Sequence, residues 1–156
     1  MADGSKPFSR EEVLARVPQQ DPFRFIDGID ALDEDHIVGN YRFPEDADFY
    51  RGHFPGNPIT PGVLLIETMA QTGVVAFGLY LLSLQEGGRD EVEKLLTIFT
   101  EANVEFSGMV RPGQRVVTTA HKDMFRRRKL RARVEMRLDD GALVASGTVA
   151  GMGVPR

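Results

Sequence analysis

A proline-rich loop and the apolar stretch that follows it hold the side chains of this chain that are best suited to chemistry. His53 opens the loop, and Glu67 and Gln71 lie in the apolar stretch. Proline fixes φ, so a loop with three prolines has few conformations and can hold an imidazole at little entropic cost. We expect burial to raise the pKa of the Glu67 carboxyl group, which would keep it protonated as a general acid. Gln71 stands one helical turn further on and can orient that carboxyl group.

The beginning of the apolar stretch adds a third chemical group. If a helix begins there, the backbone N–H groups of Gly62 and Val63 have no partner within it, and the positive end of the helix dipole lies beside them. Such donors suit an oxygen atom that becomes negative during a reaction. A base, an oxyanion donor and an acid together fit removal of a proton α to a carbonyl with loss of a β leaving group.

Structural roles for the same residues stay open on this basis. A single histidine in a proline-rich loop is usually structural, and a single glutamate in an apolar helix is more often a paired buried acid. The hydroxyl group of Thr60 could also cap the helix and occupy the Gly62 or Val63 donor, which would weaken the oxyanion interpretation. The residues by themselves therefore predict an elimination site without excluding a structural one.

Residues 62–84 form the apolar stretch, 23 residues in which Glu67 is the only charge. Pro61 suits the first helical position, and Gly87 and Gly88 end the run. A helix of this length could cross a membrane. Glu67 and Gln71 on one face argue against that location, because buried polar groups are costly in lipid, so we predict a central helix covered by protein.

The rest of the chain is expected to consist mainly of strands. Residues 131–138 alternate strictly between apolar and charged side chains, which predicts a strand with one buried face. The other expected elements are a helix at 10–16 capped by Ser9, two strands within 27–43, and strands at 95–106, 116–120 and 143–150. An antiparallel sheet wrapped around one buried helix satisfies this order, so we predict a single α+β domain over residues 1–156.

Composition narrows the chemistry and the setting. The 156 residues include no cysteine, which excludes a disulfide framework, thiolate metal ligands and a cysteine nucleophile. The N-terminus has no basic stretch followed by an apolar run, so we expect no secretory signal and a cytoplasmic location. The formal net charge of −4 conceals a basic segment, since residues 121–137 hold 8 Lys and Arg residues against 2 acidic ones.

Residues 52–71, GHFPGNPITPGVLLIETMAQ, resemble the signature GHFPxxPxxPGVLxxExxAQ of the FabZ-type 3-hydroxyacyl-acyl-carrier-protein dehydratases. Segments 21–27, 106–113 and 125–128 resemble further parts of that family. The chain departs from the family where Pro18, Gln19 and Gln20 replace a usual Pro-His-Arg, and where Gly28 replaces an arginine. The catalytic positions match, so these departures bear only on the pathway, which is fatty-acid synthesis or a specialised polyketide or aryl-polyene route.

The resemblance implies a hotdog fold, in which a sheet wraps around a central helix, and a dimer or trimer of dimers with active sites between subunits. His53 of one chain would remove the α-proton of a 3-hydroxyacyl thioester, and Glu67 of the other would protonate the departing hydroxyl group. The Gly62 N–H would bind the thioester carbonyl, and a backbone carbonyl near Ile59 would hold the His53 ring. The product would be the trans-2-enoyl thioester, formed reversibly.

The same resemblance implies no metal and no organic cofactor, because the substrate arrives on the phosphopantetheine of an acyl carrier protein. Val63 and Gln71 would contribute to substrate binding beside Gly62. The acyl chain would lie in an apolar tunnel whose expected lining includes Phe54, Met69 and Phe77.

The basic run of Arg126, Arg127, Arg128 and Lys129 is expected to dock the acidic carrier protein and to bond the phosphopantetheine phosphate. The alternative is a solvated hairpin turn. No nucleic acid is expected, because the chain is acidic overall and the basic run has almost no interleaved aromatic side chains. Two rival functions remain, a hotdog acyl thioesterase and a non-catalytic hotdog protein that binds acyl carrier protein.

Overall fold

The computed structural model describes residues 6–156 and contains one antiparallel sheet of six strands. The spatial order of the strands is β1-β2-β4-β5-β6-β3, so the short β1 and the long β3 are the two edges of the sheet. The strands are β1 Gly28–Leu32, β2 His36–Arg42, β3 Leu95–Phe106, β4 Arg115–Arg126, β5 Lys129–Leu138 and β6 Leu143–Pro155. The strands at 28–32, 36–42 and 95–106 match the expected positions, and β4 and β6 run further than their apolar patterns indicated.

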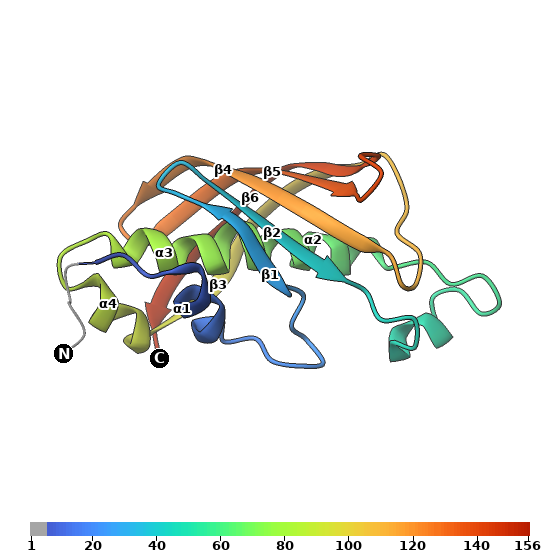
Figure 1. Ribbon diagram of the computed structural model, residues 1–156, viewed down its shortest axis with the longest axis horizontal. Coiled ribbons are helices and arrows are strands. Elements are labelled where there is room, and N and C mark those ends of the chain that lie inside the picture. Colours follow the sequence, from blue (N-terminus) through green and yellow to red (C-terminus); the bar gives the residue numbers. More distant parts are fainter. Residues whose placement is uncertain (1–5) are drawn as a thin grey trace.

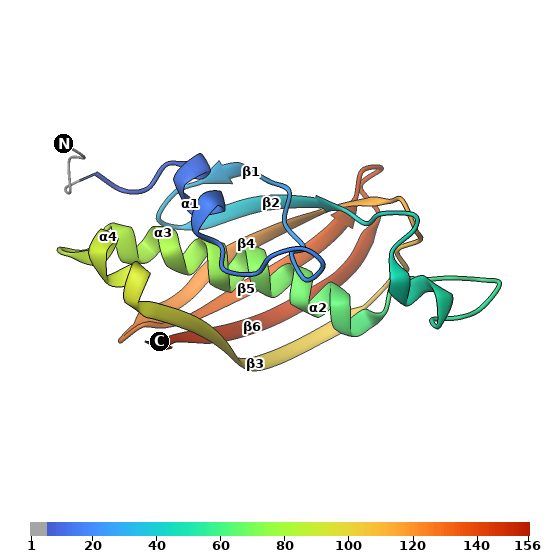
Figure 2. The same cartoon turned by 90° about the horizontal axis from the view of Figure 1, so that it is seen from below.

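A single long helix lies in the concave side of this sheet (Figures 1 and 2). It is α-helical at its two ends, as α2 Gly62–Ala70 and α3 Phe77–Ser83, and has a π-helical middle, η2 Gln71–Ala76. It ends one residue earlier than expected. The sequence pattern did not indicate the π-helical segment. This is the α+β arrangement predicted from the order of elements, a sheet wrapped around one helix.

The sheet approaches the helix most closely at its π-helical middle. A Cβ atom added to Gly73 would lie 3.0 Å from Val134 and 3.1 Å from Ala120, so a larger residue there would require the sheet side chains to shift. Ala132, Val134 and Met136 of β5 are fully buried against this side, as their alternation predicted, whereas Leu138 is only partly buried. The helix therefore packs on the interior faces of β4, β5 and β6.

The helix spanning Gly62–Ser83 is long and apolar enough to cross a bilayer, by length and composition only. In this structure 61% of its most apolar window is buried inside the molecule. The sheet covers one side of the helix, and the N-terminal segment with α1 Arg10–Arg16 covers part of the other (Figure 2). A helix that is apolar on all faces is expected wherever protein surrounds it.

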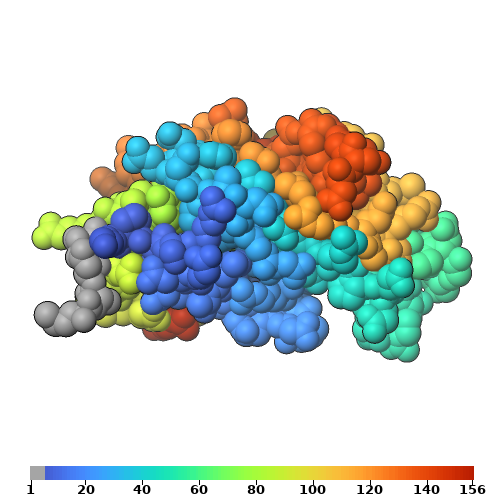
Figure 3. Space-filling model, in the orientation of Figure 1, coloured from blue at the N-terminus to red at the C-terminus, as the bar shows by residue number. Residues whose placement is uncertain are grey.

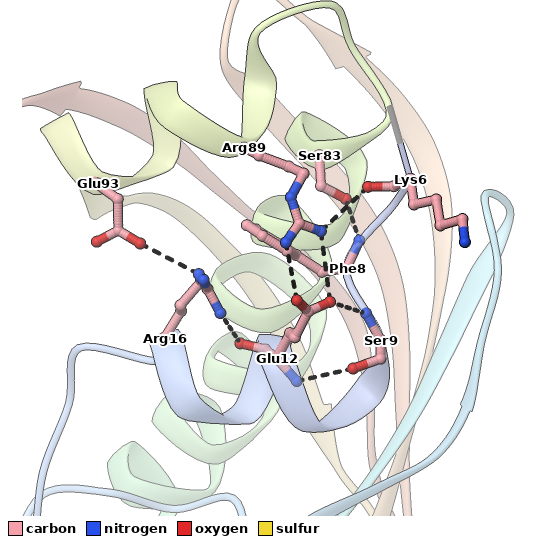
Figure 4. A network of polar contacts seen from close by, with 8 residues as sticks. All are labelled: Lys6, Phe8, Ser9, Glu12, Arg16, Ser83, Arg89 and Glu93. Carbon is pink, nitrogen blue, oxygen red and sulfur yellow. Dashed lines mark hydrogen bonds and ion pairs between the residues drawn. The ribbon is translucent and has the colours of Figure 1, made fainter. Parts of the chain in front are cut away.

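The N-terminal segment packs against the C-terminal end of the central helix (Figures 3 and 4). Phe8 is buried, and the guanidinium groups of Arg16 and Arg89 lie 4.4 and 4.6 Å from the centre of its ring. The Phe8 N–H donates to Ser83 Oγ at 3.0 Å. Arg89 Nη2 donates to Glu12 Oε1 at 2.8 Å, so an ion pair joins α1 to the segment that follows α3.

Helix α1 begins as the sequence predicts. Ser9 and Glu12 form a reciprocal capping box, in which each side chain accepts from the other residue's backbone N–H. Three short helices were not expected, because elements of three or four residues carry no readable periodicity. They are η1 Asp48–Arg51, α4 Gly88–Glu91 and η3 Val92–Lys94.

Candidate active site

His53 lies in the loop that projects beyond the N-terminus of α2 (Figure 2). Its Nδ1 is 2.9 Å from the carbonyl oxygen of Ile59, which is the contact expected from the sequence. A carbonyl oxygen only accepts, so Nδ1 carries the proton in this contact and Nε2 is left with its lone pair. The Ile59 N–H in turn donates to the His53 carbonyl oxygen at 3.1 Å, and the His53 backbone N–H donates to the Phe49 carbonyl oxygen at 3.1 Å. The loop therefore fixes both the position and the tautomer of the imidazole.

The N-terminus of α2 has no side-chain cap. The expectation that Thr60 caps it is wrong, because the Thr60 hydroxyl is buried and lies 2.6 Å from the hydroxyl oxygen of Tyr50. The Thr60 N–H donates to the Val110 carbonyl at 2.8 Å, which fixes the backbone just before the helix. The first N–H groups of the helix, those of Gly62 and Val63, are therefore not taken by Thr60. This removes the objection that the sequence raised against an oxyanion-binding role.

Glu67 is half-buried on the second turn of α2. Burial raises the pKa of its carboxyl group above the ordinary value, and a hydrogen bond from Gln71 offsets part of this increase. Gln71 Nε2 donates to Glu67 Oε1 at 2.9 Å. Since Oε1 accepts this bond, the proton of the neutral acid belongs on Oε2, the oxygen that receives no hydrogen bond from residues 6–156. The Glu67 carboxyl group is thus oriented and biased towards its protonated form.

Gln71 also joins the helix to an N-terminal segment that the sequence did not connect with the site. The Gln71 side chain is fully buried, its Oε1 accepts from the Phe25 N–H at 2.6 Å, and its Nε2 donates to the Phe23 carbonyl at 2.9 Å. With the bond to Glu67, the amide uses both of its N–H donors and its oxygen. One side chain therefore fixes the acid and also the chain that runs past it.

A cavity of about 150 Å³ opens beside Glu67. Its lining combines the helix, the start of β3 and the segment before Phe23: Gln19, Glu67, Ala70, Val74, Val75, Thr97 and Phe99. Met69 and Phe77, which were expected to line an acyl tunnel, are fully buried in the hydrophobic core and do not line this cavity, so their contact with an acyl chain stays a prediction. Phe54 is exposed beside the His53 ring, with the two ring centres 4.4 Å apart.

His53 is not among the residues that line the Glu67 cavity. Its loop projects past the beginning of the helix (Figure 2). The residues that line the cavity belong to the second to fourth turns of the helix, to the start of β3 and to the segment before Phe23. The N-terminus of α2 lies at the other end of β3, where the Phe106 ring would contact a Cβ atom placed on Gly62 at 3.2 Å. A single chain thus has the acid Glu67 near one end of β3, and the base His53 and the free N–H donors of α2 near the other end.

The basic run forms the turn between β4 and β5, at the opposite end of the molecule from the His53 loop (Figure 2). Arg127 and Arg128 have φ of 52° and 64°, as a two-residue hairpin turn requires. Arg128 forms an ion pair with Glu91. Arg126 and Arg127 are exposed, and Lys129 is partly buried. Within one chain this turn therefore cannot serve the His53 loop.

Residues 6–156 contain no cluster of three or more His, Asp or Glu side chains that could hold a metal ion. The other two histidines pair across β2 and β4, where the rings of His36 and His121 stack with centres 5.8 Å apart. His36 Nδ1 also lies 2.9 Å from Asp33 Oδ1. Neither histidine lines the Glu67 cavity.

Known proteins resemble this chain in both sequence and fold. A family described as FabA-like domain matches residues 17–149. A 3-hydroxyacyl-acyl-carrier-protein dehydratase FabZ from Streptococcus pyogenes serotype M3 is 36% identical over 139 residues, which cover 88% of this chain and 93% of that protein. The protein of the same name from serotype M1 matches equally well.

Among solved structures, a thioesterase from Haemophilus influenzae superposes with a TM-score of 0.67 at 18% identity, covering 97% of this chain and 94% of that one. A mutant thioesterase from Pseudomonas aeruginosa gives a TM-score of 0.66 at 13% identity and covers 97% of both chains. At such identities the likeness concerns the fold alone. It confirms the hotdog fold expected from the sequence.

Proposed function

This chain belongs to the FabA-like family, and on that premise we propose that it is a 3-hydroxyacyl-acyl-carrier-protein dehydratase. It would eliminate water reversibly from a 3-hydroxyacyl thioester to give the trans-2-enoyl thioester. The observation that carries this proposal is the fixed tautomer of His53, whose Nδ1 donates to the Ile59 carbonyl at 2.9 Å and so leaves a basic Nε2. The named dehydratases at 36% identity support the same activity.

In this mechanism, His53 Nε2 removes the proton from the α carbon of the thioester. Negative charge then develops on the thioester oxygen, and the N–H groups of Gly62 and Val63 at the uncapped start of α2 stabilise it. Glu67 gives the proton on Oε2 to the departing hydroxyl group, and water leaves as the C–O bond breaks. Burial raises the pKa of Glu67 above its ordinary value, which favours the protonated form that this step needs.

The two halves of this machinery meet only if a second copy contributes one of them. Strand β3 is an edge of the sheet, so its outer backbone groups have no partner strand among residues 6–156. Several of its large apolar side chains are exposed, namely Leu96, Ile98, Phe99 and Phe106. A long apolar edge of this kind is suited to pairing with the same edge of a second copy.

Antiparallel pairing of the two β3 strands would bring the separated groups together. It places the Leu95 end of one strand beside the Phe106 end of the other. Thr97 lines the Glu67 cavity, and Phe106 packs against Gly62, so the cavity of one copy would face the helix start and His53 loop of the second. We therefore place the complete site between two copies, with either a dimer or a trimer of dimers as the full assembly.

The same pairing gives the basic turn a role. Gly153 lies between Leu95 and Arg128, so the turn is at the Leu95 end of β3 and would lie beside the second copy's His53 loop. Arg126, Arg127 and Lys129 would attract the acidic carrier protein and its phosphopantetheine phosphate. Arg128 is less available, because it is paired with Glu91. Charge reversal at Arg126 and Arg127 should therefore lower kcat/KM for carrier-protein substrates more than for pantetheine thioesters, and equal losses would contradict docking.

Incubation with a 3-hydroxyacyl pantetheine thioester tests the proposed reaction. A dehydratase produces the 2-enoyl thioester and converts it back when the enoyl compound is supplied. Release of free thiol would instead identify a thioesterase, the alternative activity, which is found in solved proteins of the same fold. Absence of turnover at every chain length would identify a protein that only binds its partner. We expect turnover without an added metal or organic cofactor, in the cytoplasm, in fatty-acid synthesis or a specialised polyketide or polyene route.

A further inference from the structure

Gln19 has a buried amide oxygen with no partner beside the acid of the proposed reaction. Its Oε1 is inaccessible to solvent and accepts no hydrogen bond from residues 6–156. The same side chain lines the cavity that Glu67 lines. An acceptor left buried and unpaired is unfavourable, and this one stands on a side chain that lines a cavity, so it points to a donor that pairs with Oε1 when the amide turns towards the cavity during function.

The position of Gln19 is well defined by its surroundings. Val17 is buried on one side of it, and on the other side Gln71 holds both Phe23 and Phe25 by hydrogen bonds to their backbone. Because Gln71 also holds Glu67, one buried amide sets the placement of the segment that carries Gln19 relative to the carboxyl group. Gln19 and Glu67 thus face the same space from two different parts of the chain.

The chemistry of the cavity identifies the missing donor. Glu67 Oε2 must give its proton to the hydroxyl oxygen at the β carbon, and that hydroxyl still has a hydrogen of its own. An uncharged acceptor beside the acid can bind this hydrogen, and it can continue to bind it when the group leaves as water. The Gln19 amide lines the same cavity as Glu67 and supplies such an acceptor once its oxygen turns towards that space, whereas Glu67 Oε1 is already occupied by Gln71.

Resting on the proposed function, we propose that Gln19 is a substrate-binding residue whose Oε1 accepts a hydrogen bond from the 3-hydroxyl group of the acyl thioester. This bond holds the C–O bond towards Glu67 and distinguishes hydroxylated acyl chains from saturated ones. When a site is built around a hydroxyl group, an analogue without it leaves the partner unpaired and binds less well.

The test compares two ligands in a protein that cannot turn them over. In a His53→Asn background, we measure the Kd of a 3-hydroxyacyl pantetheine thioester and of the saturated acyl thioester of equal length. With Gln19 present, the hydroxylated ligand should bind about 3- to 10-fold more tightly, as expected for one net hydrogen bond. Gln19→Leu should abolish this preference and leave the Kd of the saturated ligand within twofold. Gln20→Leu is the matched control, since Gln20 is exposed and does not line the cavity.

The outcomes separate this inference from the proposed reaction. A preference that survives Gln19→Leu overturns the inference, and so does a parallel loss of affinity for both ligands, which would mean that Gln19 only shapes the cavity. A weaker dimer with the preference intact would mean that Oε1 binds the second copy instead. The proposed reaction is judged on its own by turnover of the wild-type protein. Gln19→Leu should not lower Tm, because it removes an unpaired buried acceptor.

Discussion

The two ends of the central helix differ in how completely their polar groups are paired. At the Ser83 end, the side-chain hydroxyl accepts from Phe8, Arg89 pairs with Glu12, and two guanidinium groups cover the Phe8 ring. At the Gly62 end there is no side-chain cap, Val63 is 73% exposed and Phe54 is 55% exposed. A closed network stabilises the fold, whereas unpaired donors and exposed apolar groups are what a substrate or a second subunit can bind.

The comparison predicts that changes at the Gly62 end affect activity and changes at the Ser83 end affect stability. The largest expected effect is on turnover. His53→Ala and Glu67→Gln should each lower kcat by about 10²- to 10⁴-fold, because each removes a general acid or base. The Tm of His53→Ala should stay near that of the wild type.

A mixture of these two inactive variants tests whether the site is shared. If one chain supplies the base and the other the acid, each hybrid dimer has one intact site, and random exchange restores about a quarter of the activity. The measurement needs proof of subunit exchange, for example by mass spectrometry of tagged copies. Exchange without any return of activity would show that both groups come from the same chain.

The second effect concerns the Ser83 end of the central helix. Phe8→Ala should lower the free energy of unfolding by about 3–5 kcal/mol, since Phe8 is buried and its ring supports two guanidinium groups. Turnover per folded molecule should change little, because Phe8 lies at the end of the helix far from the site. Denaturant unfolding and active-site titration at a temperature well below Tm measure the two quantities. A large loss of kcat in the folded Phe8→Ala protein would contradict the prediction that the Ser83 end affects stability and not activity.

A third effect is the pH dependence that Glu67 brings to stability. Its pKa is raised in the folded state, so the protein binds this proton more tightly when folded. The stability that the proton provides is present at low pH and is lost as pH rises through the raised pKa. Glu67→Gln should therefore raise Tm more at pH 8 than at pH 4. Even at pH 8, this increase in Tm should be smaller than the decrease in Tm caused by Phe8→Ala. Equal changes at both pH values would mean that the carboxyl group is not protonated by burial.

The smallest effect is expected from Glu12 at the Ser83 end of the helix, and its pH dependence of stability is opposite in sign to that of Glu67. Its pKa is lowered to about 2, chiefly by the hydrogen bond from Arg89, with a further contribution from the backbone N–H of Ser9. A lowered pKa gives stability that is complete above the ordinary value of 4.5 and is lost as pH falls towards 2. The Tm of the wild type should therefore fall between pH 4.5 and pH 2. In Glu12→Gln this part of the fall should disappear, and an unchanged profile would show that the pair contributes nothing measurable.

Local patterns of the sequence predicted the elements and much of the site. The capping box at Ser9 and Glu12 and the alternation along β5 depend on neighbouring residues, so they could be read directly. The contact of His53 with Ile59 spans six residues within one rigid loop, which is why the motif was sufficient for it. The Thr60 cap failed because a longer-range partner, Tyr50, binds the same hydroxyl group.

The sequence alone thus determined the helix, the strands, the family and the types of group that could perform the reaction, because these depend on local periodicity and on a fixed motif. Tertiary structure alone decided that Gln71 joins Glu67 to Phe23 and Phe25, that Gln19 faces the same cavity, and that the basic turn lies far from His53. These relations join residues tens of positions apart. They depend on how the sheet curves around the helix and on which edge it leaves unpaired, and no local pattern encodes either property.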